Sequence, residues 1–196
     1  MPATASTDSA MSGARPLADG ETLGLLPFPF DSITPLPEGA SNLTSCRRSG
    51  RWQIASRGFD DQVGTDLFIR PAASGSCATD SLPGDLVIRN QEADYFEATW
   101  EDRLFVDSGT GPDGRGLTLY ELPSGRRLVG LTIAEGVFRS TEPHEILVWT
   151  QHDLRETAPG CTRRESMIPV IDSLVRVDLR TGAVTRTGTT RCSAWS

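Results

Sequence analysis

Short runs of apolar residues, interrupted by polar ones, dominate the chain from residue 50 onward. The clearest pair covers residues 117–122 and 127–133, on either side of Pro123-Ser124-Gly125. Short runs that are rich in β-branched or aromatic residues and bounded by Gly, Pro, Asp and Ser are typical of β-strands. The pattern predicts strands at residues 51–55, 66–70, 85–89, 104–106, 117–122, 127–133, 145–149, 173–179 and 183–185.

The stretch from Ala93 to Leu104 fits two periods. Phe96, Trp100 and Leu104 repeat every four residues, as they would on a helix face. Phe96, Ala98 and Trp100 also alternate with other residues, as they would on a strand. Because so short a window does not decide between the two periods, we favour a strand and leave one helical turn open.

A weak internal repeat indicates how the strands are arranged. Residues 117–129 and 175–184 each read as a strand, a turn that contains glycine and a returning strand. Such hairpins are typical of propeller blades, but a closed propeller needs at least about four blades of roughly 40–50 residues, and this chain has room for about three. We therefore predict an all-β fold with little helix, in which antiparallel meanders form either a propeller-like stack or a two-sheet sandwich.

The first 45 residues differ in composition from the rest. They are rich in Ala, Ser, Thr, Gly and Pro, and the prolines around Phe28 and Phe30 exclude a helix and a central strand. We predict that residues 1–45 form a disordered or extended tail and that residues 46–196 form a single β domain stapled by disulfides. Met1–Gly20 has no basic stretch followed by an apolar one, so we expect either that a signal peptide was removed or that the protein is cytosolic.

The four cysteines favour the first of these alternatives. Cys46 and Cys77 are separated by 31 positions, and so are Cys161 and Cys192. The equal spacing, with strand-like sequence inside each pair, favours the disulfides Cys46–Cys77 and Cys161–Cys192 over four buried free thiols. Closing a loop of this length is worth about 3.7 kcal/mol in the chain-entropy model. Disulfides persist in oxidising compartments, so we expect a periplasmic or secreted protein.

The charge of the chain argues against several partners. It has 26 acidic residues, 19 arginines and no lysine, for a net charge of −7. An acidic surface disfavours nucleic acid and anionic membrane surfaces. No stretch approaches the roughly 18 apolar residues of a membrane-spanning helix, so we expect no membrane insertion.

Motifs for catalysis or cofactor binding are missing from the sequence. There is no Gly-x-Ser-x-Gly elbow, no phosphate-binding loop with its lysine, and no Cys-x-x-Cys spacing. We therefore predict no catalytic residue, no cofactor and no metal ion.

One resemblance supports the fold prediction. The run LFVDSGTGPDGRGL at residues 104–117, the hairpin VDLRTG at 177–182 and the closing TGTTRC at 187–192 resemble segments of uncharacterised exported bacterial β-domain proteins with a propeller-like hairpin pattern. The resemblance covers roughly residues 100–192, and it implies a fold more than a function. A looser similarity is to propeller-like periplasmic lysozyme inhibitors, but no inhibitory loop matches.

Two loops are candidate binding sites. In the Asp107–Gly116 loop, Asp107 and Asp113 either bind Ca²⁺ together with backbone carbonyls or cap tight turns at glycines. The loop from Gln151 to Met167 is long and polar, and Cys161 anchors it. Its candidate binding residues are His152, Arg155, Glu156, Arg163 and Arg164. The two arginines that follow Cys161, like Arg47, Arg48 and Arg51 after Cys46, either clamp an acidic partner or form a solvated face.

These observations favour a non-enzymatic exported protein that binds another macromolecule, a protein or other polymer of the cell envelope, as a binding, inhibitor or accessory domain. One alternative is a carboxylate-dependent hydrolase such as an all-β glycosidase, which needs two carboxylates facing each other about 5–10 Å apart. The other is a structural accessory subunit of an envelope complex.

Overall fold

The chain folds entirely into β-strands and turns within the residues that the computed structural model describes. These are residues 32–33, 44–72, 77–109, 114–142, 144–151 and 168–195. The strands are β1 (Ser32–Ile33), β2 (Thr44–Ser49), β3 (Trp52–Gly58), β4 (Thr65–Pro71), β5 (Leu86–Ile88), β6 (Asp94–Trp100), β7 (Arg103–Ser108), β8 (Arg115–Glu121), β9 (Arg126–Glu142), β10 (Glu145–Gln151), β11 (Ile168–Asp178) and β12 (Val184–Trp195). The all-β prediction is confirmed, and the ambiguous stretch at 93–104 contains β6, a turn at residues 101–102 and the start of β7.

All strand pairs are antiparallel, and they form two open sheets with the orders β1-β2-β3-β4-β5 and β12-β11-β10-β9-β8-β7-β6. The long strand β9 pairs with two neighbouring strands along different parts of its length. Its first half pairs with β8 and its second half with β10, and Ile133 lies opposite both Arg115 and Thr150. The seven-stranded sheet therefore consists of two four-stranded meanders that share β9.

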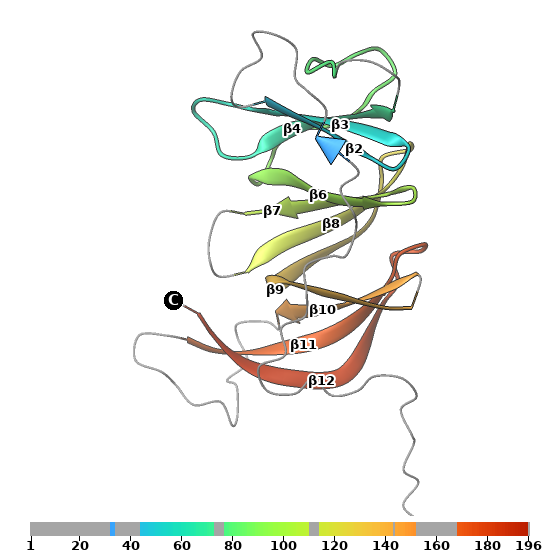
Figure 1. The fold of residues 1–196 in the computed structure, drawn as a ribbon. Coiled ribbons are helices and arrows are strands. Elements are labelled where there is room, and N and C mark those ends of the chain that lie inside the picture. Colours follow the sequence, from blue (N-terminus) through green and yellow to red (C-terminus); the bar gives the residue numbers. More distant parts are fainter. Residues whose placement is uncertain are drawn as a thin grey trace, which may run out of the picture.

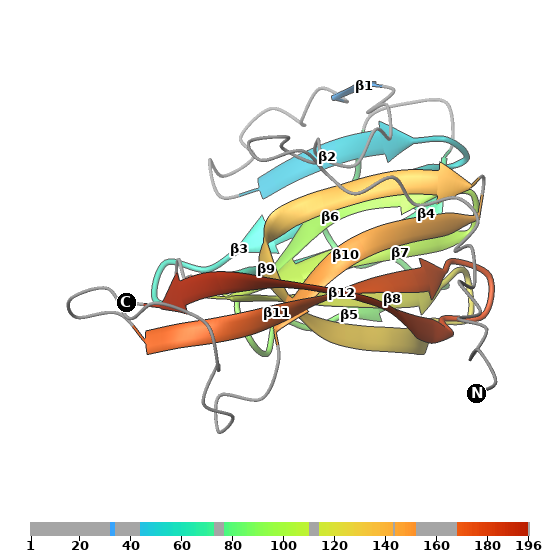
Figure 2. The same cartoon turned by 90° about the horizontal axis from the view of Figure 1, so that it is seen from below.

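Three layers are stacked in this way (Figure 1). Layer 1 is β1 to β5, layer 2 is β6 to β8 with the first half of β9, and layer 3 is the second half of β9 with β10 to β12. Figure 2 shows the stack turned by 90°, with β11 and β12 in front. The predicted antiparallel meanders are present, and neither sheet closes into a barrel.

The middle of β7, an inner strand of layer 2, is buried on both faces. Leu104 and Val106 pack against layer 1, together with Trp52 and Ile54 of β3. Phe105, between them in sequence, points the other way into the core shared with layer 3. A strand that is covered on both faces reads as a continuous apolar run, as Leu-Phe-Val does here. Burying each such side chain contributes about 1.5–3 kcal/mol to stability.

The predicted tail contributes one short strand. Ser32 and Ile33 pair with Arg48 and Arg47 of β2 at the edge of layer 1. The other residues before Thr44 lie outside the described residues, so the division of the chain at residue 45 stays a prediction.

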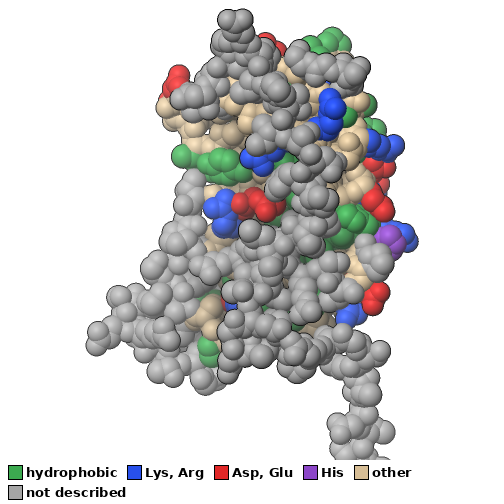
Figure 3. All heavy atoms as spheres, viewed as in Figure 1, with side chains coloured by type: hydrophobic (Ala, Val, Ile, Leu, Met, Phe, Trp, Pro, Cys, Tyr) green, Lys and Arg blue, Asp and Glu red, His purple; other side chains and the backbone are tan. Residues whose placement is uncertain are grey.

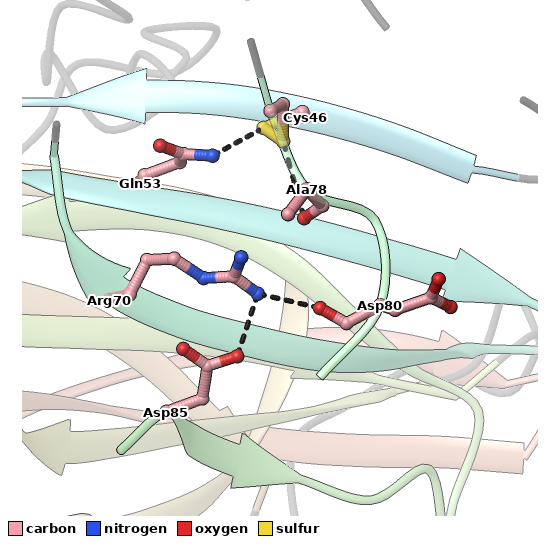
Figure 4. Close-up of a disulfide and its surroundings, with 7 residues drawn as sticks. Cys46, Gln53, Arg70, Ala78, Asp80 and Asp85 are labelled. Carbon is pink, nitrogen blue, oxygen red and sulfur yellow. Dashed lines mark hydrogen bonds and ion pairs between the residues drawn. A yellow bond between two sulfur atoms is a disulfide. The ribbon is translucent and has the colours of Figure 1, made fainter. Parts of the chain in front are cut away.

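The Cys46–Cys77 disulfide is confirmed, with Cα atoms 6.1 Å apart. It lies on the outer face of layer 1, where both cysteines pack with Ala55 and Phe68. Figure 4 shows how the segment after Cys77 is held: Arg70 of β4 donates to the Asp80 carbonyl at 3.0 Å and to the Asp85 carboxylate at 2.7 Å. Cys192 is also disulfide-bonded. Its predicted partner Cys161 lies outside the described residues.

Candidate functional site: a loop clamp beside a charged cluster

Most of the predicted binding residues lie outside the described residues. This holds for Asp113 and for His152, Arg155, Glu156, Arg163 and Arg164. The binding role of the Gln151–Met167 loop therefore stays a prediction. Asp107 is described, and it leads to a cluster of charged side chains.

Asp107, near the end of β7, forms an ion pair with the neighbouring strand β8. Arg115 of β8 donates from Nε to Asp107 Oδ1 at 2.9 Å, and its Nη2 contacts the other carboxylate oxygen. Both carboxylate oxygens are thus engaged. The hydrogen bond that Arg115 donates to Asp107 raises the pKa of Arg115 above its ordinary value. In this structure Asp107 joins β7 to β8.

Glu97 lies beside this pair at an irregularity of edge strand β6. Phe96 is opposite Val106 and Ala98 is opposite Phe105, so Glu97 is an extra residue without an opposite partner. Such a bulge redirects a side chain and is common next to functional sites. Burial raises the pKa of the Glu97 carboxyl, and the charge of Asp107 raises it too, while Arg115 and Arg47 oppose the shift.

We call Arg47, Glu97, Asp107 and Arg115 the charged cluster. Arg47 comes from β2 in the other sheet, and its guanidinium lies 5.7 Å from the ring centroid of Phe96. Within the described part of the chain, Glu97 makes no hydrogen bond or ion pair. A half-buried carboxyl without a partner is costly in the charged form, and it is therefore the group in this cluster that a ligand would relieve.

A pair of interlocked loops continues this surface. Residues 59–64 join β3 to β4, and residues 89–93 join β5 to β6. Asn90 Nδ2 donates to the Val63 carbonyl at 2.7 Å, and the Gly64 N–H donates to the Tyr95 hydroxyl at 3.0 Å. We call the two loops the loop clamp.

Asp94 holds the second loop of the clamp. Its carboxylate accepts from the Gln91 N–H at 2.9 Å and from the Ser108 hydroxyl at 2.6 Å. Its own N–H donates to Asn90 Oδ1 at 2.9 Å. These bonds tie the loop both to itself and to β7, so the loop conformation is fixed before any partner binds.

Backbone strain accompanies this packing. Ala93 has φ 60°, which is rare for a residue with a side chain. Gly64 has φ 92°, and a Cβ atom there would fall on Asn90 Oδ1 and within 2.7 Å of the Ala93 Cα. Strained positions persist only when surrounding contacts hold them, and they gather at binding and switch sites.

The loop clamp presents an unusual set of side chains to solvent. Val63 is 61% exposed. Asp60, Asp61 and Glu92 are exposed and make no ion pair within the described ranges. Tyr95, which contacts the clamp through its hydroxyl, lies opposite Asp107 on β7, so the clamp and the charged cluster are neighbours.

Charges of both signs occur together on the molecular surface. Figure 3 shows basic, acidic and hydrophobic side chains side by side where the first two layers meet. Among the described residues, no three His, Cys, Asp or Glu side chains come together as metal ligands. The described part also contains no helix long and apolar enough to cross a membrane.

Comparisons with protein-family models, curated proteins and solved structures found no match for this chain.

Sequence reasoning did not identify the loop clamp or Glu97. The clamp depends on contacts between residues about 30 positions apart, such as that of Gly64 with Tyr95. The one local signal was Val63, an apolar residue within the polar run Asp60-Asp61-Gln62-Val63-Gly64. Arg47 was recognised only as part of an arginine group after Cys46.

Proposed function

We propose that this protein acts by binding another macromolecule outside the cytoplasm, without catalysis. The observation that carries the proposal is the loop clamp. Hydrogen bonds join its two loops, which carry an exposed valine and three exposed carboxylates that make no ion pair among the described residues. Association costs less when the binding loops are ordered beforehand, because little conformational entropy is lost. The disulfide at Cys46–Cys77 supports an oxidising compartment, and we propose the periplasm or the exterior.

Affinity capture with matched baits tests the proposal. The wild-type chain is compared with the clamp variant D60N/D61N/V63S in an envelope extract, and retained proteins are quantified by mass spectrometry. Leu82→Ser is the control bait, because Leu82 is also exposed, at 44%, but lies outside the clamp. We expect the wild type and L82S to retain a protein that the clamp variant loses.

The captured protein is then purified and titrated against the three baits by calorimetry. We expect the clamp variant to bind at least about tenfold more weakly, since it loses two charges and the apolar Val63 side chain, which a bound partner would bury. Equal binding by all three baits would show that the clamp is not the binding surface. Retention of no protein by any bait would contradict the binding function itself.

A second candidate rests on Glu97 and Asp107. Two neighbouring carboxyls, one with a raised pKa and one in an ion pair with an arginine, offer the two groups that acid–base hydrolysis of a glycosidic bond needs. In that case Glu97 donates a proton to the leaving oxygen and Asp107 accepts one from the attacking water. Release of reducing sugar from envelope polysaccharide by the wild type, and its loss in both E97Q and D107N, would establish this activity in place of binding.

A further inference from the structure

Among the described strands, β12 has one backbone edge that pairs with no other strand. In the sheet order β12 is terminal, and among the described strands it pairs only with β11. An edge strand carries a row of backbone N–H and C=O groups on its outer side, and proteins normally blunt or cover such a row. The first half of β12 is also exposed at its side chains, with Val184 at 42%.

The register identifies which groups point outward. The Asp178 N–H donates to the Ala183 carbonyl at 2.9 Å, so Ala183 directs its backbone toward β11. Val184 and Arg186, which lie opposite Val177 and Val175, therefore occupy the alternate positions whose N–H and C=O face away from β11. Gly188, with φ 83°, marks a register shift that ends this regular stretch.

The charge of this edge is opposite to that of the whole chain. Residues 179–196 contain three arginines and no acidic residue, in a protein with a net charge of −7. Arg191 pairs with Asp172, and Arg180 contacts His144. Arg186 is exposed and makes no ion pair within the described part of the chain.

We propose that the open edge of β12 at residues 184–187 binds an extended acidic segment of a partner protein as an added β-strand. Backbone hydrogen bonds supply affinity in this mode of recognition, and side chains of alternate residues supply specificity. The unpaired Arg186 selects acidic side chains, and the exposed Val184 supplies an apolar contact. A second copy of this chain fits poorly, because pairing of two β12 edges brings arginines together.

Fluorescence anisotropy of the full chain tests the proposal. The probe is a labelled peptide of alternating glutamate and valine, and a peptide of alternating lysine and valine is the control. Val184→Pro removes one outward N–H while Arg186 stays in place, and we expect about fivefold weaker binding from the lost hydrogen bond. Arg186→Glu should weaken binding by a similar factor at low salt, whereas Arg127→Glu, at an exposed arginine of β9 rather than β12, should not.

Several results would overturn the proposal. One is failure of the acidic peptide to bind, or equal binding of the two peptides. Another is unchanged binding by R186E, which keeps the backbone edge and so remains informative if V184P does not fold. A third is sedimentation as a dimer that V184P dissociates, since the edge would then be occupied by a second copy. The proposal does not depend on the loop clamp, and the clamp variant D60N/D61N/V63S should bind the peptide normally.

Discussion

Removal of the Cys46–Cys77 disulfide should destabilise the fold by two separable effects. The crosslink closes a loop of 31 residues, and the chain-entropy model gives about 3.7 kcal/mol for a loop of that length. Both cysteines are also fully buried against Phe68 and Ala55. Replacing each sulfur with hydrogen in C46A/C77A leaves a small cavity that costs about 1 kcal/mol per site. We therefore expect a total loss of about 5–6 kcal/mol.

The predicted Cys161–Cys192 disulfide provides a control with the same loop length. Its cysteines have the same separation, so the entropic contribution lost in C161A/C192A is also about 3.7 kcal/mol. Cys192 is exposed, so its replacement removes little packing. The difference between the two double mutants, about 1–2 kcal/mol, then reflects the buried sulfur atoms of layer 1. Reducing the wild type removes Cys46–Cys77 and the predicted second crosslink while all four sulfurs stay in place.

Urea denaturation at constant pH measures these free energies of unfolding by linear extrapolation. Of the two double mutants, C46A/C77A should unfold at the lower urea concentration. The reasoning fails if C46A/C77A loses less than about 2 kcal/mol, because loop closure alone should exceed this value. It also fails if C161A/C192A is the less stable protein, since burial would then not explain the difference.

Three further predictions concern the candidate site and the long loop. Burial raises the pKa of Glu97 in the folded protein, so the stability that this carboxyl contributes is present below its unfolded pKa and is lost as the pH rises through its folded pKa. E97Q should therefore be more stable than the wild type at pH 7, by less than about 1 kcal/mol for a partly exposed group, and should lose that advantage at pH 4. A stability difference in thermal melts that does not depend on pH would refute this. Gly64→Ala should lower the free energy of unfolding in urea by at least about 2 kcal/mol, because the added Cβ meets backbone atoms. Gly50→Ala, at φ 56° and with open space around it, should lower it by about 1 kcal/mol. Equal losses would contradict the packing argument. H152A/R155A/E156A should retain the wild-type melting temperature and weaken binding of the captured partner, and unchanged binding would exclude the Gln151–Met167 loop as a contact.

The strands that the sequence pattern predicted are those with a buried face. Residues 117–122 and 127–133 alternate strongly because one side of each strand packs into the core, and they match β8 and the first half of β9. β2 was missed because Thr44–Ser49 is mostly polar. β12 was predicted only at residues 183–185 but extends to Trp195. Its threonine-rich second half has no apolar period, and pairing with β11 alone determines that it is strand.

The second half of β9 is another strand that the local sequence pattern did not predict. The apolar alternation ends at Ile133, yet the strand runs on to Glu142 because β10 pairs with it. The shared strand is what turns one seven-stranded sheet into two layers. No local pattern at residues 134–142 encodes this, since the pairing is decided by a partner strand that follows a turn. The loop clamp was missed for a similar reason, because Gly64 and Tyr95 are far apart in sequence.

The burial of β7 limits which apolar side chains this protein can present to a partner. Leu104, Phe105 and Val106 alternate between two cores, so neither face of this strand is free. We therefore expect binding at the ends and edges of the stack. The loop clamp lies where layers 1 and 2 meet, and β12 is the outermost strand of layer 3. Among the described residues, the carboxylates of the first surface and Arg186 of the second make no ion pair, so a partner that engages one surface by charge is repelled by the other. The two surfaces are thus expected to bind different segments, and raising the salt concentration should weaken both interactions while leaving the fold unchanged.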